Sequence, residues 1–236
     1  MKYQLKWLAL VVLLLTANVH IQAQQYKTFK PKLTLGVGAG PVFSSVDFVT
    51  TVPQNTTQGL SGGVSLRYIT EMHLGLVAEL NYTQRGWTED FSEAPKNPDH
   101  AYSRTLNYIE LPLLTHIYFG NKVKFVLNLG PQVSYMFSDK GTMNDALTEY
   151  INGKREEDPD NPIGLQYEEV NSKFDYGLLA GVGVEFDTSL GSFILEGRYY
   201  FGLGDSFDSS RIKPGNFSRS AHRYMAAKLT YYFFSF

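Results

Sequence analysis

The stretch that decides the fold is Phe174-Asp175-Tyr176-Gly177-Leu178-Leu179-Ala180-Gly181-Val182-Gly183-Val184-Glu185-Phe186. Its even-numbered residues are all apolar or aromatic, whereas its odd-numbered residues are mostly glycine or acidic. Alternation sustained over this length indicates a β-strand with one apolar face and one small or polar face. A strand that crosses a bilayer needs about 9–11 residues, and this run is long enough.

The same period of two recurs along the chain and predicts eight strands. They are residues 33–40, 60–68, 74–83, 109–119, 123–137, 174–186, 193–203 and 224–236. The links after the second, fourth and sixth strands are short, whereas the links after the first, third, fifth and seventh are long and polar. An even strand number with alternating short and long links is typical of outer-membrane barrels, which have tight periplasmic turns and longer extracellular loops.

We therefore predict an all-β fold, an eight-stranded antiparallel transmembrane β-barrel with both termini in the periplasm. A soluble β-sandwich is one alternative, but its strands usually have about five or six residues and its loops need not alternate in length. A soluble lipocalin-like barrel is the nearer alternative, and it would bury the apolar face. The small and charged residues of the other face suit the narrow centre of a small barrel, so we expect the apolar face to contact lipid.

Composition narrows the function classes. The 236 residues include 16 Tyr, 16 Phe and 21 Gly, no Cys, and a formal net charge of −2. The absence of Cys excludes disulfides, thiolate metal sites and a catalytic thiol. The slightly negative charge argues against a nucleic-acid partner, which would require a basic stripe.

The first 23 residues are interpreted as a secretory signal peptide. Lys2 and Lys6 precede an apolar run, Leu8–Ala17, and the segment ends at Ile21-Gln22-Ala23, so cleavage is expected after Ala23. A transmembrane helix is the alternative, but it would require about 20 apolar residues. Residues 24–32 are then a periplasmic lead-in and residues 33–236 the barrel, located in the cell outer membrane.

The chain ends on an aromatic strand whose last residue is Phe236. Such an end resembles the signal that the outer-membrane barrel assembly machinery recognises, which makes Phe236 a candidate assembly signal. The alternative is a closing strand that is aromatic for packing reasons alone.

One segment carries a family resemblance. Leu106-Asn107-Tyr108-Ile109-Glu110-Leu111-Pro112-Leu113-Leu114 resembles the "YIE(I/L/F)PLL" strand of PorT-like outer-membrane β-barrel proteins of Bacteroidota. The Gly120-Asn121 turn, the glycine-rich run at 176–186 and the Gln22-Ala23-Gln24 context are also similar to that group. The resemblance implies a barrel in the outer membrane. It leaves the role open, because members include secretion-linked proteins and barrels of unknown role.

The candidate site is a set of charged residues that share the polar face by parity. An eight-stranded barrel has an interior just wide enough for its own side chains, and buried charges must be paired to be tolerated. We interpret the set as a lumen charge network that fills the barrel, and a conducting path is the alternative. Its members are Arg67, Glu79, Glu110, Lys124, Glu185, Glu196 and Arg198, with Asp175 and His116 nearby on the same face.

Two further features of the sequence carry separate hypotheses. Pro112 lies in mid-strand and lacks a backbone N–H, so a bulge or local break is expected beside it. The long loop 138–172 is acidic, but Asp158, Asp160 and Glu169 match a calcium loop poorly, because Pro162 and Ile163 occupy essential positions. We expect a solvated acidic loop, with a divalent site bridging to lipopolysaccharide phosphates as the alternative.

Enzyme motifs are absent from the sequence, which has neither a GxSxG elbow nor an HExxH pair. A rim hydrolase or acyltransferase, using His100 or His222 with Ser103 or Ser220, is the least favoured alternative. We predict an integral outer-membrane barrel with a non-enzymatic role, structural, secretion-linked or loop-mediated, and a narrow porin for small solutes as the alternative. We expect no catalytic residue, metal or cofactor. The expected partners are outer-membrane lipid and lipopolysaccharide, the barrel assembly machinery, and envelope or secretion proteins.

Overall fold

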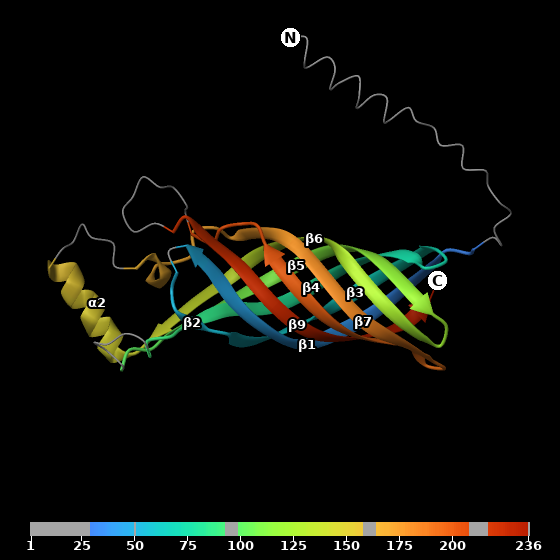
Figure 1. Ribbon diagram of the computed structural model, residues 1–236, viewed down its shortest axis with the longest axis horizontal. Coiled ribbons are helices and arrows are strands. Elements are labelled where there is room, and N and C mark those ends of the chain that lie inside the picture. The colour runs from blue at the N-terminus through green and yellow to red at the C-terminus, as the bar shows by residue number, and fades with distance from the viewer. Residues whose placement is uncertain (1–28, 50, 93–98, 158–163, 208–216, 236) are drawn as a thin grey trace, which may run out of the picture.

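Eight long antiparallel strands form the barrel in the computed structural model, which describes residues 29–49, 51–92, 99–157, 164–207 and 217–235 (Figure 1). A two-residue strand, β2, extends the sheet beside β4. The strands are β1 (Lys32–Val49), β2 (Gln54–Asn55), β3 (Thr57–Glu71), β4 (Leu74–Glu89), β5 (Tyr102–Gly120), β6 (Val123–Met143), β7 (Phe174–Thr188), β8 (Gly191–Gly202) and β9 (Arg219–Ser235).

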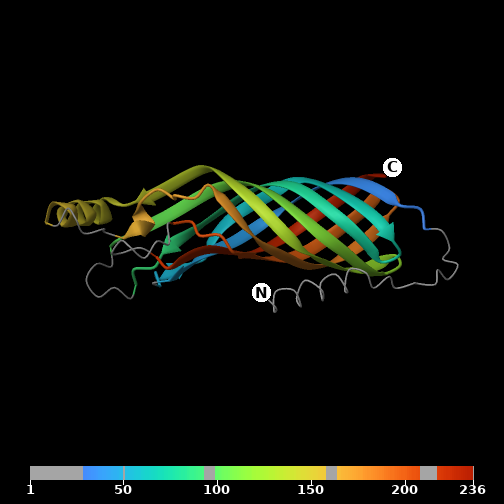
Figure 2. The same cartoon turned by 90° about the horizontal axis from the view of Figure 1, so that it is seen from above.

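The sheet closes on itself because the first and last strands pair. Val37 of β1 lies opposite Tyr231 of β9, and β4 pairs with β5 to complete the ring of neighbours in chain order. A closed ring leaves no long unpaired edge. The backbone N–H and C=O groups are therefore hydrogen-bonded between strands, which is necessary because lipid offers them no partner. The view from above shows the strands strongly tilted across one another (Figure 2). The predicted eight-stranded antiparallel barrel is confirmed.

The short turns gather at one end of the barrel, together with the end of β9 (Figure 1). They fall after β3, β5 and β7, as the sequence predicted, and in outer-membrane barrels this is the periplasmic end. His73, in the first of these turns, has a φ of 76°, and its ring Nδ1 lies 2.9 Å from the Tyr118 carbonyl oxygen. Gly191, after the third, has a φ of 143°, a conformation that glycine adopts without a steric penalty.

Several strands run further toward the extracellular side than the sequence predicted. β1 continues to Val49, so the first link is only the segment 50–56. The reason is an inversion of the pattern: in this half Val46 and Phe48 point inward and are buried, whereas Asp47 points outward. Strands that rise above the bilayer face water outside, so their apolar side turns to the interior.

The long link between β6 and β7 contains a helix that the sequence analysis did not predict. Helix α2 (Asp145–Glu157) begins after Asn144, whose side-chain Oδ1 accepts a hydrogen bond from the Leu147 backbone N–H at 3.1 Å, as an N-cap residue does. A short 3-10 turn, η1 (Leu165–Tyr167), follows. No helix in the described ranges has the length and apolar character required to cross a membrane.

The backbone around Pro112 is less disturbed than expected. The register between β4 and β5 is the same on both sides of it, with Ala78 opposite Leu113 and Asn81 opposite Glu110. The ladder is interrupted between these two pairs without a shift of register. The register between β5 and β6 shifts at Asn107/Tyr108, where Phe137 of β6 has no partner. Of the two alternatives expected beside Pro112, a bulge or a local break, the structure has the local break.

The apolar face points outward. Leu113 is 59% exposed and Leu129 is 54% exposed, whereas the charged residues of the other face are almost completely buried inside. The soluble lipocalin-like alternative required the opposite orientation and is wrong. A contiguous apolar band around the wall is the surface that a bilayer covers.

Orientation can be tested by introducing a charge at two depths. Leu129→Arg should lower the free energy of unfolding by about 2–4 kcal/mol, because its side chain lies in the apolar band. Val49→Arg, at the outer end of β1, should lower it by about 0–1 kcal/mol. Urea unfolding of the protein folded into lipid vesicles measures both changes. Equal tolerance of Arg at the two positions would contradict the orientation.

Candidate functional site in the barrel lumen

A four-residue charge cluster occupies the middle of the lumen. Arg198 of β8 contacts both carboxylate oxygens of Glu79, with Nη1–Oε2 and Nη2–Oε1 distances of 2.7 and 2.8 Å. Its Nη2 also donates to Glu196 at 2.8 Å, and the Lys228 ammonium donates to Glu79 at 2.8 Å. Two cations therefore face two carboxylates, and bidentate Arg–carboxylate pairing is among the stronger charge-assisted interactions.

Amide side chains complete this cluster. Asn81 donates to Glu79 and accepts from Lys228, at 2.8 and 3.0 Å. Asn128 donates to Glu196 at 2.8 Å, and its Oδ1 lies 2.8 Å from Nδ1 of His116. Lys228 was not among the predicted site residues, because both faces of the last strand carry aromatic residues and the inward face could not be assigned. The side chains of the cluster come from five strands, and their contacts fix the relative positions of these strands.

A second cluster is centred on Arg85 of β4, which is fully buried. Its Nε donates to Glu110 at 2.8 Å, its Nη1 to Asp175 at 2.6 Å and its Nη2 to Ser134 at 2.8 Å. The strand predicted from the sequence ends at residue 83, so Arg85 was not among the predicted site residues. The signal that could have found it is parity, because Arg85 continues the inward series of Glu79, Asn81 and Thr83.

Tyrosines enclose the Arg85 cluster. The guanidinium carbon lies 4.4, 4.6 and 5.0 Å from the ring centroids of Tyr108, Tyr200 and Tyr224. The Tyr200 hydroxyl donates to Asp175 at 2.9 Å, and the Tyr224 hydroxyl donates to Glu110 at 3.2 Å. The single cation of this cluster faces two carboxylates, so these hydroxyl groups supply the further hydrogen bonds that buried carboxylates require.

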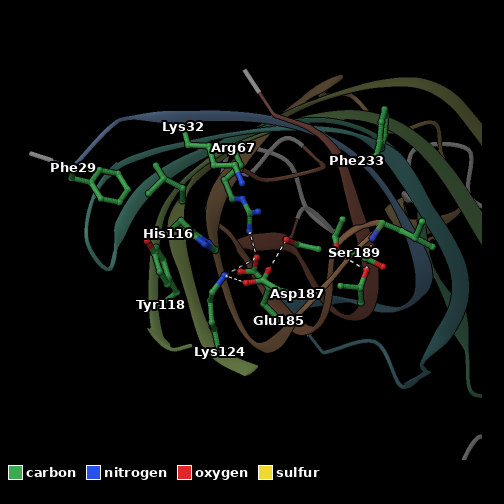
Figure 3. Close-up of a pocket in the computed structure, with 15 residues that line it drawn as sticks. Phe29, Lys32, Arg67, His116, Tyr118, Lys124, Glu185, Asp187, Ser189 and Phe233 are labelled. Atoms are coloured by element: carbon green, nitrogen blue, oxygen red, sulfur yellow. Dashed lines mark hydrogen bonds and ion pairs between the residues drawn. The ribbon is translucent and has the colours of Figure 1, made fainter. Parts of the chain in front are cut away.

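A third cluster lies at the periplasmic mouth. Arg67 Nη1 donates to Glu185 at 2.9 Å, and Lys124 contacts Glu185 at 3.4 Å and Asp187 at 2.6 Å. Figure 3 shows these side chains converging on the floor of a pocket, with His116 beside them. The pocket has a volume of about 570 Å³ and is bordered by the last periplasmic turn. It ends at these ion pairs, so it is a vestibule below the central cluster.

The extracellular half is filled by apolar side chains and closed by loops. Trp87 and Leu106 are fully buried, and they belong to a cluster that also contains Leu147 and Ile151 of α2 and Phe207 of the last long loop. Arg104 of β5 makes a bidentate pair with Asp139 of β6, at 2.6 and 2.7 Å. Its Nη1 also donates to the backbone carbonyls of Gln166 and Glu168, which ties the loop between β6 and β7 to the strands.

The residues predicted for the site thus fall into separate groups. Glu79, Glu196 and Arg198 meet in the central cluster, Glu110 lies with Arg85 and Asp175, and Arg67, Lys124 and Glu185 meet at the periplasmic mouth. Sequence parity placed all seven on one face. It gave no means of choosing partners, because Arg67–Glu185 and Arg198–Glu79 join strands far apart in the chain, whereas Lys124–Glu185 joins neighbouring strands.

The residues of the rim-enzyme hypothesis do not assemble. His222 is buried, with Nε2 3.2 Å from the Tyr108 hydroxyl, and the Ser220 hydroxyl accepts from the Phe207 backbone N–H. His100 and Ser103 border one groove at the rim, but the ring of His100 packs against Phe91 and Tyr150. In the described ranges, no hydrogen-bonded His–Ser–acid group joins these residues, and no three His, Asp or Glu side chains gather as metal ligands do.

Some sequence hypotheses concern residues outside the described ranges. These are the signal peptide at 1–23, the assembly signal Phe236, and Asp158 and Asp160 of the divalent-site hypothesis. They remain predictions.

Closed antiparallel strands, an apolar outer wall and a filled polar interior define an integral outer-membrane β-barrel protein. The chain belongs to the outer membrane protein beta-barrel domain family, whose profile matches residues 22–208. The protein therefore resides in the outer membrane. No curated protein sequence matches the chain significantly.

Three solved structures are similar in fold at low identity. Ail, the attachment invasion locus protein of Yersinia pestis, is 12% identical, with 88% of this chain and 100% of that chain covered and a TM-score of 0.43. Neisserial surface protein A is 13% identical, with 84% and 96% covered and a TM-score of 0.42. OprG of Pseudomonas aeruginosa is 9% identical, with 87% and 93% covered and a TM-score of 0.39.

The central cluster gives a double-substitution test. Arg198→Ala should lower the free energy of unfolding by about 3–5 kcal/mol, because it leaves a buried charge without its partner. Glu79 retains Lys228 in this variant, so Glu196 is the orphaned group. Adding Glu196→Gln should therefore recover part of the loss, whereas adding Glu79→Gln should recover less because it orphans Lys228. Urea unfolding in vesicles measures the series, and equal recovery by both would contradict the assigned pairing.

Proposed function

We propose that the protein is a non-conducting, non-enzymatic barrel of the outer membrane that fixes its extracellular loops as an interaction surface. The observation that carries this proposal is the filled lumen. Three charge clusters and an apolar extracellular core occupy the interior in succession. The lumen of an eight-stranded barrel is only wide enough for side chains, so buried ion pairs fill it and leave no water-filled path.

The loop between β6 and β7 has the properties of a presented element. Its helix α2 is anchored by Leu147 and Ile151, which are 1% and 4% exposed. The neighbouring segment is held by the Arg104–Asp139 pair and by the Val170 backbone N–H, which donates to Asp139 at 3.0 Å. Tyr150 remains 44% exposed on the helix. A helix so fixed presents its polar face in a constant orientation, which favours loop-mediated binding of an envelope partner.

Family-level details of this proposal rest on the sequence. The Tyr108-Ile109-Glu110 strand supports membership of the PorT-like group of Bacteroidota, and with it a secretion-linked role. The leader ending at Ala23 supports export, and the aromatic terminus at Phe236 supports recognition by the barrel assembly machinery. Lipopolysaccharide is the expected lipid partner of the extracellular half. We propose these assignments together with the barrel's structural role.

Conductance separates this proposal from the narrow porin. The purified protein in planar bilayers should show no steady open-channel current, because ions would have to displace the Arg198–Glu79 and Arg67–Glu185 pairs. Arg198→Ala should give at most small, irregular currents. Steady conductance in the unmodified protein, with ion selectivity altered by Arg198→Ala at unchanged stability, would establish the porin and overturn the proposal.

Loop-mediated binding can be tested in native envelopes. Replacing α2, residues 145–157, by a flexible Gly/Ser segment should abolish co-purification of an envelope partner while the barrel still folds. Met72→Ser, in a periplasmic turn, is the matched control because it alters an exposed residue at the opposite end. Electrophoretic mobility with and without heating checks folding of both variants. Retention of the same partners after loss of α2 would contradict the loop as the binding element.

A further inference from the structure

The outer wall is hollowed over β7, β8, β9 and β1. One hollow of about 400 Å³ is floored by Ala180 and Gly197, and a second of about 540 Å³ extends from Tyr199 and Met225 toward Thr56 and Arg223. Tyr199 and Met225 border both hollows, so together they form one groove that runs along the wall. We call it the wall groove.

The wall groove exists because its floor carries no side chain larger than a methyl group. A Cβ on Gly197 would meet one atom within 4 Å, the Val182 carbonyl oxygen at 3.9 Å, so the space outside the strand is open. Gly197 pairs with Ala227 of β9, which is also small and exposed. An apolar channel of this kind on a lipid-facing wall offers contact area to an extended hydrocarbon chain.

A pair of arginines marks the extracellular end of the wall groove. The Arg223 guanidinium lies 3.8 Å from the centroid of the Phe201 ring, and its Nη2 lies 3.2 Å from Oδ2 of Asp47. Arg219 Nε lies 3.6 Å from the same oxygen. Two cations share one carboxylate, so the three groups carry a formal charge of +1. Nη1 of Arg223 also donates to the backbone carbonyls of Gly202 and His222, at 2.7 and 2.9 Å. Ser45 and Thr56 add hydroxyl groups at this end of the groove.

The depth of this end in the membrane follows from the aromatic residues around it. Phe174, Tyr176 and Phe201 are exposed on the outer wall near the extracellular ends of β7 and β8. Aromatic girdles of outer-membrane barrels lie at the boundary between hydrocarbon and headgroups. Because Arg223 stacks on Phe201, its guanidinium lies at headgroup depth in the outer leaflet, and the groove descends from there into the hydrocarbon.

We propose that the wall groove binds one molecule of lipopolysaccharide, the phosphorylated glycolipid of the outer leaflet. A phosphate is held by Arg219 and Arg223, sugar hydroxyls contact Ser45 and Thr56, and one acyl chain lies along Tyr199 and over Gly197. Arginine matches phosphate through paired, charge-assisted hydrogen bonds. This inference rests on the lipopolysaccharide partner of the proposed function and adds the site that binds it. It does not depend on whether the lumen conducts.

Native mass spectrometry of the full folded chain in detergent tests the site, with bisphosphorylated lipid A as the probe. The double variant Arg219→Gln/Arg223→Gln should weaken 1:1 binding about tenfold through loss of charge-assisted bonds. Lys140→Gln/Lys173→Gln removes the same charge from exposed extracellular positions off the groove and should leave binding unchanged. Lipid A without phosphates should bind the unmodified protein as weakly as lipid A binds the arginine variant.

A second variant tests the acyl channel without touching charge. Gly197→Leu should fill the groove and weaken lipid A binding, whereas Gly62→Leu, at another open outward position where the nearest atom is Ala39 Cβ at 3.5 Å, should not. Equal weakening by the control variants, absence of a 1:1 complex, or equal retention of phosphatidylglycerol would overturn the proposal. Currents in planar bilayers are measured separately, so failure here leaves the closed-lumen result intact.

Discussion

The contact on which the structure depends is the buried group of Arg198, Glu79, Glu196 and Lys228. An eight-stranded barrel is too narrow to hydrate charges in its centre, so each charge must find a partner across the lumen. Arg198 spans from β8 to Glu79 on β4, and Lys228 brings β9 to the same carboxylate. Strand hydrogen bonds close the ring, and these pairs hold strands on opposite sides of it together.

The barrel consists of two halves with opposite polarity. In the membrane the wall is apolar and the interior is charged, whereas toward the extracellular end the interior holds Trp87 and Phe48 and the wall carries Asp47 and Arg219. The same strands serve both environments because the side chains alternate with a period of two in each. The exchange of faces explains why the strands continue beyond the bilayer and form a folded support for the loops.

This arrangement places the chemistry available to partners at the two ends and on the wall. The charged groups of the interior are paired with one another, so Arg85 and Arg198 contribute stability and strand position. Helix α2 is fixed to the rim through Leu147 and Ile151, and the wall groove presents Arg223 where a lipid headgroup would lie. Binding to proteins and binding to lipid are therefore assigned to different surfaces of one rigid barrel.

The sequence by itself determined the strand number, the alternation of turn lengths and the common face of the seven predicted charged residues, because strand positions and side-chain directions follow from a local period of two. Tertiary structure alone decided which charges meet: Arg67 pairs with Glu185 and Arg198 with Glu79, across strands far apart in the chain. It also decided the strand ends. Beyond residue 40, apolar residues of β1 such as Val46 and Phe48 point inward instead of outward, and this exchange is recognised as a continuation of the strand only when its position above the bilayer is known. Arg85 was missed because it lies beyond the predicted end of its strand, and Lys228 was missed because both faces of the last strand carry aromatic residues. The alternation along a strand decides whether a side chain points into or out of the barrel, whereas closure of the barrel decides which side chains meet inside it.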